Sequence, residues 1–330
     1  MPRRTPNKSA RKRMPEARHD SVLVEEVLAA LDVHAQDTVV DATLGGAGHF
    51  AAILARLGEG GTVVGIDADP RAVDRARLVY AEDRRADRPV AYLVNDNFRN
   101  LRHILDRLGL GTVDKTLFDL GWSGFQIAEP RGFSFQRDEP LLMTYAGGGQ
   151  SAADLVNRLS EADLADLLYG YGEERFARGI ASAIVAMRAR ERILSTKQLV
   201  AAVESGTPRW YRQRKIHPAT KTFQALRIAV NDELGALRDA IMAALKALSP
   251  GGRLAVITFH SIEDRVVKNL LRDAAYEGYG SLSPKKPIVP SRVEALANRR
   301  ARSAKLRVFE RTAAGPVQRA DADATVFSYA

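Results

Sequence analysis

The feature that most constrains the fold of this chain is an alternation of short β-branched runs with helical patterns, which is typical of a parallel sheet with crossover helices. Five such runs follow one another, and a sixth comes late in the chain, where we expect it at the sheet edge. The runs are Thr38–Ala42, Thr62–Asp67, Val90–Val94, Thr116–Asp119, Arg253–Phe259 and Lys305–Glu310. The sequence therefore predicts an α/β, doubly wound sheet, in which ligands bind beyond the carboxyl ends of the strands.

The interval between the fourth and fifth runs is far too long for a single crossover helix. Its first part is helical in pattern, and Ser160 with Asp163 fits a capping box. After His217 a second long helix is predicted, which ends at Ser-Pro-Gly-Gly in residues 249–252. Its apolar positions, spaced by three and four, are Phe223, Leu226, Val230, Leu234, Leu237, Ile241, Leu245 and Leu248. We therefore expect a helical domain over residues 126–217, inserted between the fourth and fifth strands.

Composition excludes several classes of site. With 330 residues, 45% of them hydrophobic, the chain can bury a substantial core. No apolar run approaches the ~20 residues that cross a bilayer, so we expect a soluble cytoplasmic protein without a membrane contact. The absence of cysteine excludes disulfides, thiolate nucleophiles and cysteine zinc sites, and the six histidines lack short metal-ligand spacings. No metal is expected.

The net charge of +9 is concentrated in two segments. Residues 1–18 carry +6 and residues 285–311 carry +7, which leaves −4 for the rest of the chain. Such local concentration is expected when a phosphate backbone is the partner. Residues 1–18, rich in Pro, Arg and Lys, are expected to be a disordered basic tail, whose role is either to contact RNA or to aid solubility. Residues 312–330 form a second, C-terminal tail.

A glycine-rich turn follows the first strand directly, in the segment D-A-T-L-G-G-A-G-H from Asp41 to His49. Glycines let the backbone turn tightly and approach a ligand. Asp67 ends the second strand, 22 residues after Gly45, where a carboxylate can accept hydrogen bonds from both ribose hydroxyls. Turn and acid together indicate an adenosine-type cofactor. The turn lacks the third glycine of the dinucleotide pattern, which favours S-adenosylmethionine over a nicotinamide dinucleotide.

Two further strand ends point into the same crevice. Asn95-Asp96-Asn97-Phe98 follows the third strand and offers polar groups and a ring for an adenine. Asp119 ends the fourth strand, where a carboxylate that accepts a hydrogen bond from an exocyclic amine helps its nitrogen to pyramidalise. Asp119 is therefore a catalytic candidate, and the alternative is a helix cap or a cofactor contact.

Two other segments point to a nucleic-acid substrate. His260 opens a titratable cluster after the fifth strand, in which Ser261 with Asp264 fits a capping box. His260, Glu263 and Arg265 remain as candidates to orient a base or neutralise a phosphate, and His260 and Arg265 are preferred as substrate residues. Residues 209–215 interleave four cations with two aromatics and contain no acid, so they can pair with phosphates while stacking on unpaired bases. A solvated loop is the alternative for that segment.

These residues lie in motifs that resemble those of the bacterial ribosomal RNA small subunit methyltransferase H family, from His19 to about Arg311. The motifs begin at the first residue given for each: H-D-S-V-L-V-E-E-V-L at His19, D-A-T-L-G-G-A-G-H at Asp41, G-I-D-A-D-P at Gly65, R-G-F-S-F at Arg131, Y-G-E-E-R-F-A at Tyr171, H-P-A-T-K-T-F-Q-A-L-R-I at His217, F-H-S-I-E-D-R-V-V-K at Phe259 and R-S-A-K-L-R-V at Arg302. The resemblance implies a Rossmann-like class I methyltransferase sheet and S-adenosylmethionine-dependent methylation of the N4 amine of a cytidine in 16S rRNA, free or within the small subunit.

The resemblance also implies roles for individual residues. The cofactor would be held by Ala47, Gly48, His49, Asp67, Phe98, Asp119 and Gln126, of which Gln126 is implied by the resemblance alone. Asp119 and His260 are the catalytic candidates. The inserted helical domain would help to bind the RNA, and the substrate candidates are Arg131, Phe133, Arg227 and Arg265. Phe133 is equally compatible with a place in the core.

The chain departs from the family pattern in two places. It has D-L-G-W-S-G-F-Q from Asp119 where members carry D-L-G-V-S-S-P-Q, and L-L-M-T-Y from Leu141 where they carry L-D-M-R-M. The second change removes an acid and a base beside the expected cytidine pocket. Methylation of carbon 5 of cytosine normally needs a thiolate that bonds to the base, and this chain has no cysteine. We therefore expect direct methyl transfer, without a covalent enzyme intermediate. The alternatives are an NAD-dependent oxidoreductase and an RNA-binding relative that has lost catalysis.

Overall fold

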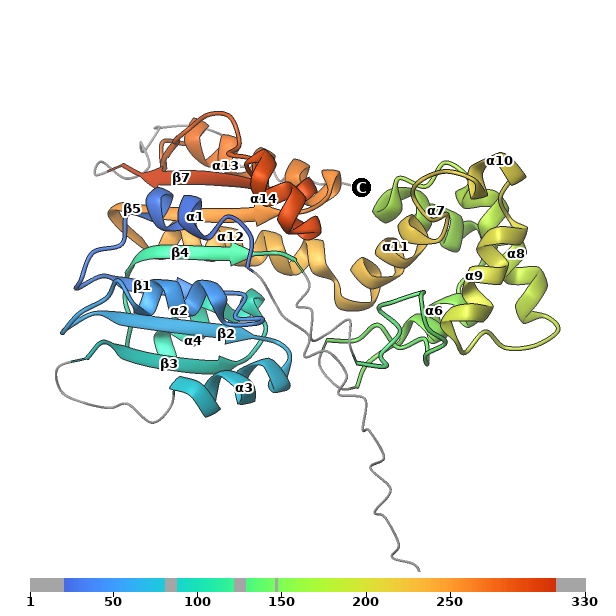
Figure 1. Cartoon of the computed structure of the whole chain (residues 1–330), viewed down its shortest axis with the longest axis horizontal. Coiled ribbons are helices and arrows are strands. Elements are labelled where there is room, and N and C mark those ends of the chain that lie inside the picture. The colour runs from blue at the N-terminus through green and yellow to red at the C-terminus, as the bar shows by residue number, and fades with distance from the viewer. Residues whose placement is uncertain (1–20, 81–87, 122–128, 146–147, 313–330) are drawn as a thin grey trace, which may run out of the picture.

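The computed structural model describes residues 21–80, 88–121, 129–145 and 148–312. These residues form a seven-stranded sheet with helices on both faces and, beside it, a lobe built of helices alone (Figure 1). Gln126, the predicted tail at residues 1–18 and all of the predicted tail at residues 312–330 except Thr312 lie outside the described residues. The strands are β1 (Thr38–Asp41), β2 (Thr62–Asp67), β3 (Val90–Asn95), β4 (Val113–Asp119), β5 (Leu248–Thr258), β6 (Gly280–Leu282) and β7 (Lys305–Arg311).

The strand order, β3-β2-β1-β4-β5-β7-β6, confirms the predicted doubly wound α/β fold. The five strands from β3 to β5 are parallel to their neighbours, whereas β7 pairs antiparallel with both β5 and β6. The chain moves outward in one direction from β1 and in the other from β4. The crevice at the carboxyl ends of these two strands is therefore the topological switch point, where α/β proteins bind ligands.

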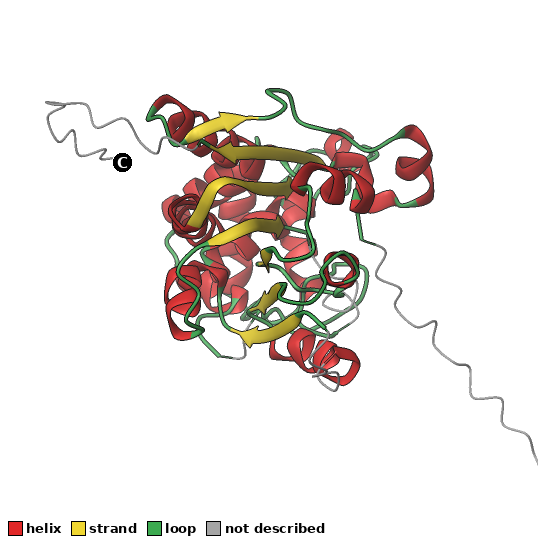
Figure 2. Cartoon of the chain, turned by 90° about the vertical axis from the view of Figure 1, so that its left-hand side faces the viewer, coloured by secondary structure: helices red, strands yellow, loops and turns green. Residues whose placement is uncertain are grey.

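Successive residues of each strand enter two different cores, because side chains alternate across a sheet. Val40 and Phe118 pack with α4 (Leu101–Arg107), α12 (Glu233–Ala247) and α13 (Ser261–Tyr276). Their neighbours Val39 and Leu117 pack on the other face with α1 (Val24–Leu31), α2 (Gly48–Leu54) and α3 (Pro70–Tyr80). Figure 2 shows these helices on both sides of the sheet. Both faces are buried, which explains why the strands read as continuous apolar runs.

The helical lobe has a core of its own, which is separate from the two cores of the sheet. Its helices are α6 (Ala152–Arg158), α7 (Glu161–Gly172), α8 (Ala177–Arg188), α9 (Thr196–Ser205), α10 (Arg209–Arg212) and α11 (Thr220–Asn231). It lies between β4 and β5 in the chain, as predicted. The core takes in Phe223 and Leu226 of α11, so the packing of the lobe reaches beyond residue 217, where the sequence pattern placed its end.

The predicted long helix after His217 is wrong as a single element, because it is broken at Asp232. This residue has φ 45° and ψ 47°, in the left-handed region, and it separates α11 from α12. The apolar spacing continues through the break, but Leu226 enters the core of the helical lobe whereas Leu237 enters a core of the sheet. The last apolar position of the predicted helix, Leu248, is already the first residue of β5.

The end of the chain also differs from the prediction. β7 was expected at the sheet edge, but the three-residue β6 pairs with it and forms the edge instead. α14 (Arg292–Ala297) and the 3-10 helix η2 (Arg299–Ser303) lead into β7, and another 3-10 helix, η1 (Phe98–Asn100), follows β3. Among the described residues, no helix is both long and apolar enough to cross a membrane.

Candidate functional site

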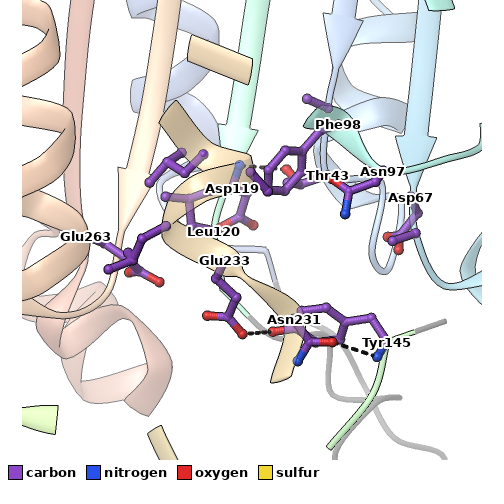
Figure 3. A pocket seen from close by; sticks show the side chains of 15 residues that line it. Thr43, Asp67, Asn97, Phe98, Asp119, Leu120, Tyr145, Asn231, Glu233 and Glu263 are labelled. Atoms are coloured by element: carbon purple, nitrogen blue, oxygen red, sulfur yellow. Dashed lines mark hydrogen bonds between the residues drawn. The ribbon is translucent and has the colours of Figure 1, made fainter. Parts of the chain in front are cut away.

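A cleft opens at the carboxyl ends of β1 to β4 (Figure 3). Thr43, Asp67, Asn97, Phe98 and Asp119 line it from the strand ends and the turns that follow. The opposite wall comes from the helical lobe, from the α11–α12 break and from the start of α13, and consists of Tyr145, Asn231, Glu233 and Glu263 among others. The cleft thus lies at the predicted crevice and is shared by the sheet and the helical lobe.

The turn between β1 and α2 is shaped by backbone geometry. Gly45 and Ala47 both have positive φ, at 50° and 61°, so the chain reverses sharply before α2 begins at Gly48. A Cβ on Gly48 would lie 2.1 Å from the hydroxyl oxygen of Ser21, so a side chain there would require the Ser21 side chain to move. The glycine pattern therefore reflects steric needs of the turn itself, in addition to any approach of a ligand.

Asp67 is held in the cleft by the backbone. One carboxylate oxygen accepts the N–H of Gly45 and the other accepts the N–H of Asp69, each at 2.8 Å. Burial raises the pKa of Asp67 to about 6, although both backbone hydrogen bonds act to lower it. The acid predicted from its distance to the glycine turn is therefore fixed in place by that turn.

The segment after β3 contributes a polar group and a ring to the same cleft. The side chain of Asn97 accepts the N–H of Arg99 at 2.9 Å and thereby begins η1. The ring of Phe98 packs edge-on against Phe118, with 5.8 Å between ring centroids. Both Asn97 and Phe98 line the cleft, next to Asp67 (Figure 3).

Three titratable side chains meet beneath the cleft. Asp119 donates its backbone N–H to the hydroxyl of Thr43 at 2.6 Å, and its carboxylate lies 3.5 Å from Nε2 of His49, which is only 5% exposed. Burial acts to lower the pKa of His49, but the hydrogen bond to Asp119 and the charges of Asp119 and Asp41 outweigh it, so the pKa is raised. Burial raises the pKa of Asp41 to about 6, although the charge of His49 opposes the rise.

The wall opposite the strands is held together by hydrogen bonds between the helical lobe and the α11–α12 break. Tyr145 donates its hydroxyl to Glu233 at 2.7 Å and its backbone N–H to Asn231 at 3.0 Å (Figure 3). Asn231 also donates to the carbonyl of Met143 at 2.8 Å. Tyr145 is the last residue of the L-L-M-T-Y departure, so that segment forms part of the cleft wall.

Arg227 lies behind this wall and is 4% exposed. Its guanidinium forms a two-nitrogen contact with Glu233, at 2.7 Å from each, and lies 3.8 Å from Glu263. Glu263 in turn lies 2.8 Å from Nε2 of His260. Arg227 and His260 are thus both paired with acids that line the cleft. A direct contact of either residue with RNA stays a prediction.

The capping box predicted for Ser261 and Asp264 is wrong. The N-cap of α13 is His260, whose Nδ1 accepts the N–H of Glu263 at 3.3 Å. Ser261 is already helical and donates its hydroxyl to Glu173 at 2.8 Å. Asp264 points away from the helix start and pairs with Lys305 and Arg307 of β7. A histidine nitrogen can replace a serine oxygen as the cap acceptor, which the sequence pattern did not reveal.

The remaining substrate candidates lie around the cleft and not inside it. Arg131 donates to Asp69 at 2.6 Å and to the carbonyl of Tyr145 at 2.9 Å, so it joins the helical lobe to the turn that holds Asp67. Phe133 is buried in the core of the lobe and stacks on Tyr145. Arg265 is exposed and pairs with Glu173 at 2.5 Å.

The wall residues Tyr145, Asn231 and Glu233 were not found from the sequence. Asn231 and Glu233 lie inside an unbroken apolar spacing, which hides the break that turns both toward the cleft. A polar Asn-Asp-Glu run at residues 231–233 was the available signal. Among the described residues, no group of three or more His, Cys, Asp or Glu side chains is placed to hold a metal ion.

Comparison with known proteins gives consistent matches over most of the chain. A family model described as the MraW methylase family matches residues 16–312. Curated relatives named ribosomal RNA small subunit methyltransferase H are 48% identical in Deinococcus radiodurans, covering 91% of this chain and 92% of the relative, and 46% identical in Methylobacterium nodulans, covering 89% and 90%. A third, from Brevibacillus brevis, is 42% identical and covers 89% and 98%. A solved rRNA methylase from Streptococcus thermophilus aligns at 12% identity with a TM-score of 0.39, covering 88% and 92%.

Proposed function

Because the chain belongs to the MraW methylase family, we propose that it transfers a methyl group from S-adenosylmethionine to the N4 amine of a cytidine in small-subunit ribosomal RNA. The substrate class follows the names of its relatives. The choice of N4 follows the sequence motifs. The observation that carries the proposal is that Asp67, Phe98 and Asp119, at or just after the ends of β2, β3 and β4, line one cleft.

S-adenosylmethionine suits this cleft in the groups that face it. Each carboxylate oxygen of Asp67 accepts one backbone N–H, and a carboxylate has about four acceptor positions, so capacity remains for two ribose hydroxyls. In this proposal the turn at Ala47, Gly48 and His49 also holds the cofactor, and Asn97 and Phe98 flank its adenine.

Asp119 is the proposed catalytic acceptor. The bound cofactor supplies an electrophilic methyl group on a sulfonium. The N4 amine of cytidine is a poor nucleophile because its lone pair is delocalised into the ring. A hydrogen bond from that amine to the Asp119 carboxylate lets the nitrogen pyramidalise, and the carboxylate then takes the proton that the nitrogen loses on forming its new bond. His49, 3.5 Å away, favours the ionised form of Asp119.

The acids on the opposite wall are proposed to orient the cytidine. Glu233 and Glu263 face the cleft, and Arg227 lies between them at the back. His260 contacts Glu263 from the other side. In this proposal Arg227 and His260 position Glu233 and Glu263. Arg131 holds Asp69, whose backbone N–H in turn holds Asp67. The partner is 16S rRNA, free or in the assembled subunit, and the protein acts in the cytoplasm.

Isothermal titration calorimetry with two ligands tests the cofactor assignment. S-adenosylhomocysteine is expected to bind with a one-to-one stoichiometry, and NADH is expected to give no heat. Transfer of a tritiated methyl group to small-subunit rRNA then tests the reaction. Tight NADH binding without S-adenosylhomocysteine binding would favour the oxidoreductase alternative, which family membership does not support. Cofactor binding without methyl transfer would favour a relative that has lost catalysis.

A further inference from the structure

A cationic surface surrounds an exposed tryptophan on the helical lobe, apart from the cleft. Trp210 lies in the short helix α10 and is 51% exposed. Figure 1 shows α10 in the helical lobe, beyond α11 and away from the sheet. We call this the Trp210 surface, and its exposed members are Arg175, Arg178, Arg209, Trp210, Arg212, Arg214 and Lys215.

The ring of Trp210 is held in place by its neighbours. It packs edge-on against Phe176 and Tyr211, with ring centroids 5.7 Å and 5.8 Å away. The guanidinium carbon of Arg175 lies 5.3 Å from the indole centroid and 5.1 Å from that of Phe176. A large aromatic side chain that is half exposed, yet supported on two sides, loses little conformational freedom when a flat partner stacks on it.

The two aromatics of the segment have different roles, which the sequence alone did not distinguish. Tyr211 is buried, and its hydroxyl donates to Glu174 at 2.7 Å. Glu174 is itself fully buried, so its carboxylate does not face a ligand on the surface. Trp210 is therefore the member of the pair that offers ring surface to a ligand.

The positive charges around Trp210 favour a ligand that carries negative charge. Residues 209–215 carry four cations and no acid. Arg175, which precedes α8, and Arg178, in the first turn of α8, add two more. A regular RNA duplex stacks its own bases and offers mainly its backbone. An unpaired strand offers phosphates to the arginines and a free base face to the indole.

We propose that the Trp210 surface binds an unpaired nucleotide of the RNA substrate, with the base stacked on Trp210 and the flanking phosphates paired with the surrounding arginines. The identity of that RNA as ribosomal rests on the proposed function, whereas the preference for a single strand does not. The Trp210 surface is a second RNA contact, on the part of the helical lobe that lies away from the sheet. It holds the RNA strand while the cleft binds the target base.

Fluorescence of Trp210 itself provides a direct test. The chain has two tryptophans, Trp122 and Trp210, so Trp122→Phe leaves Trp210 as the only one. Titration of this variant with an oligouridylate of about ten nucleotides, near the size that one single-strand surface covers, is expected to quench its emission. An RNA duplex of equal length and polyglutamate are the competitors, and both are expected to displace the oligouridylate poorly.

Substitutions separate stacking from charge. Trp210→Leu keeps an apolar side chain against Phe176 but removes the ring face, and it is expected to weaken oligouridylate binding by about 5- to 150-fold. Tyr169→Ala is the matched control, since Tyr169 is 70% exposed on the same lobe but lies one helical turn from Asp166. This control is expected to keep the parent affinity. Circular dichroism and S-adenosylhomocysteine binding verify that both variants fold.

Three results would overturn the proposal. They are absent quenching at saturating oligouridylate, equal loss of affinity in Tyr169→Ala, and equal competition by polyglutamate or by the duplex, which would indicate a general anion surface. Failure of the proposed function looks different. In that case no methyl group is transferred, but oligouridylate still quenches Trp210, and Trp210→Leu still loses affinity.

Discussion

At the scale of single residues, two buried carboxylates lie at the base of the cleft, and His49 reduces the repulsion between them. Asp41 and Asp119 are both buried at the ends of neighbouring strands, and the histidine lies in contact distance of Asp119. Its raised pKa favours its positively charged form, and that charge offsets part of the cost of burying the two carboxylates. The histidine of the glycine turn thus has an electrostatic role in addition to any contact with the cofactor.

Replacing Asp119 with Asn is expected to lower kcat by about 100-fold, because the amide is a weaker acceptor for the amine proton. The affinity for S-adenosylhomocysteine, measured by calorimetry, is expected to change far less. Asp67→Asn is the matched comparison and is expected to show the reverse pattern, with the main loss in affinity. If Asp119→Asn lost affinity and kept kcat, Asp119 would be a cofactor contact only.

The affinity for S-adenosylhomocysteine is expected to fall below about pH 6, by up to about tenfold per pH unit. Ribose hydroxyls donate to the ionised form of Asp67, and this form disappears as pH falls through its raised pKa. Because the pKa of Asp67 is raised in the folded state, its carboxyl group keeps its proton there between about pH 4 and 6, whereas the unfolded chain releases it. Asp67 therefore makes folding less favourable as pH rises through that window.

Calorimetry at several pH values checks the dependence, and Asp67→Asn is expected to remove it. A dependence of equal size in that variant would assign the titration to another group. Asp41 is the obvious one, since its pKa is also raised to about 6.

At the scale of elements, the strands and the glycine turn were predictable because each depends on local sequence. β2 and the first four residues of the first predicted run match the structure, since a buried parallel strand is a short apolar run between turns. The break at Asp232 was not predictable in this way. Apolar spacing reports that Leu226 and Leu237 are buried, but it does not report that they enter different cores. β6 has three residues and too little pattern to detect.

The residues of the site at strand ends were predictable from the sequence, whereas those from the helical lobe were not. Asp67, Phe98 and Asp119 follow strands, and the ends of parallel strands meet at one edge, so their meeting follows from the fold. Tyr145 and Glu233 come from segments whose position depends on how the helical lobe packs against the sheet. That packing is set by contacts far apart in the chain, such as the bond of Asn231 with Met143, which no local pattern encodes.

The pairing of Asp264 with β7 leads to a prediction about stability. Asp264 accepts from Arg307 at 2.7 Å and from Lys305 at 2.9 Å, and Arg307 is buried. Asp264→Asn is expected to lower the free energy of unfolding by about 3 kcal/mol, since it leaves a buried guanidinium without its charge partner. Urea unfolding measures the change. Asp273→Asn, in an exposed pair with Arg272 on the same helix, is the control and is expected to cost under about 1 kcal/mol.

The pH dependence of this pair has the opposite sign to that of Asp67. Burial acts to raise the pKa of Asp264, but the hydrogen bonds and charges of Arg307 and Lys305 outweigh it and lower the pKa. The pair therefore contributes stability above the pKa of the unfolded chain, and this contribution is lost as pH falls toward the lowered value. Equal losses in Asp264→Asn and Asp273→Asn would contradict the assigned role of the buried pair.

At the scale of the whole molecule, acidic and basic residues are unevenly distributed along the chain. The cleft wall is acidic, with Asp67, Asp119, Glu233 and Glu263, whereas cations surround Trp210 on the helical lobe. In the sequence, cations also gather in residues 1–18 and in residues 285–311. RNA is therefore expected to be attracted by the periphery and to present one base to an acidic interior. This separation allows binding strength and base choice to be altered independently.

Removal of residues 1–18 tests whether the basic tail contributes to binding. The truncated chain loses six net positive charges and is expected to bind small-subunit rRNA more weakly at about 50 mM salt, with a smaller difference at about 200 mM, because counterion release weakens with salt. Filter binding over this range measures both effects. A chain lacking residues 313–330, whose net charge is −1, is the matched control. Equal affinity of the truncated and full chains at low salt would leave solubility as the role of the tail.

We propose that this chain methylates N4 of a cytidine in 16S rRNA and that Asp119 accepts the proton of the amine. The most direct test is mass spectrometry of nucleosides from 16S rRNA of a strain that lacks the gene, complemented with either the parent chain or Asp119→Ala. N4-methylcytidine is expected to fall in the deletion strain, to return with the parent chain and not to return with Asp119→Ala. An unchanged N4-methylcytidine signal in the deletion strain would contradict the proposal.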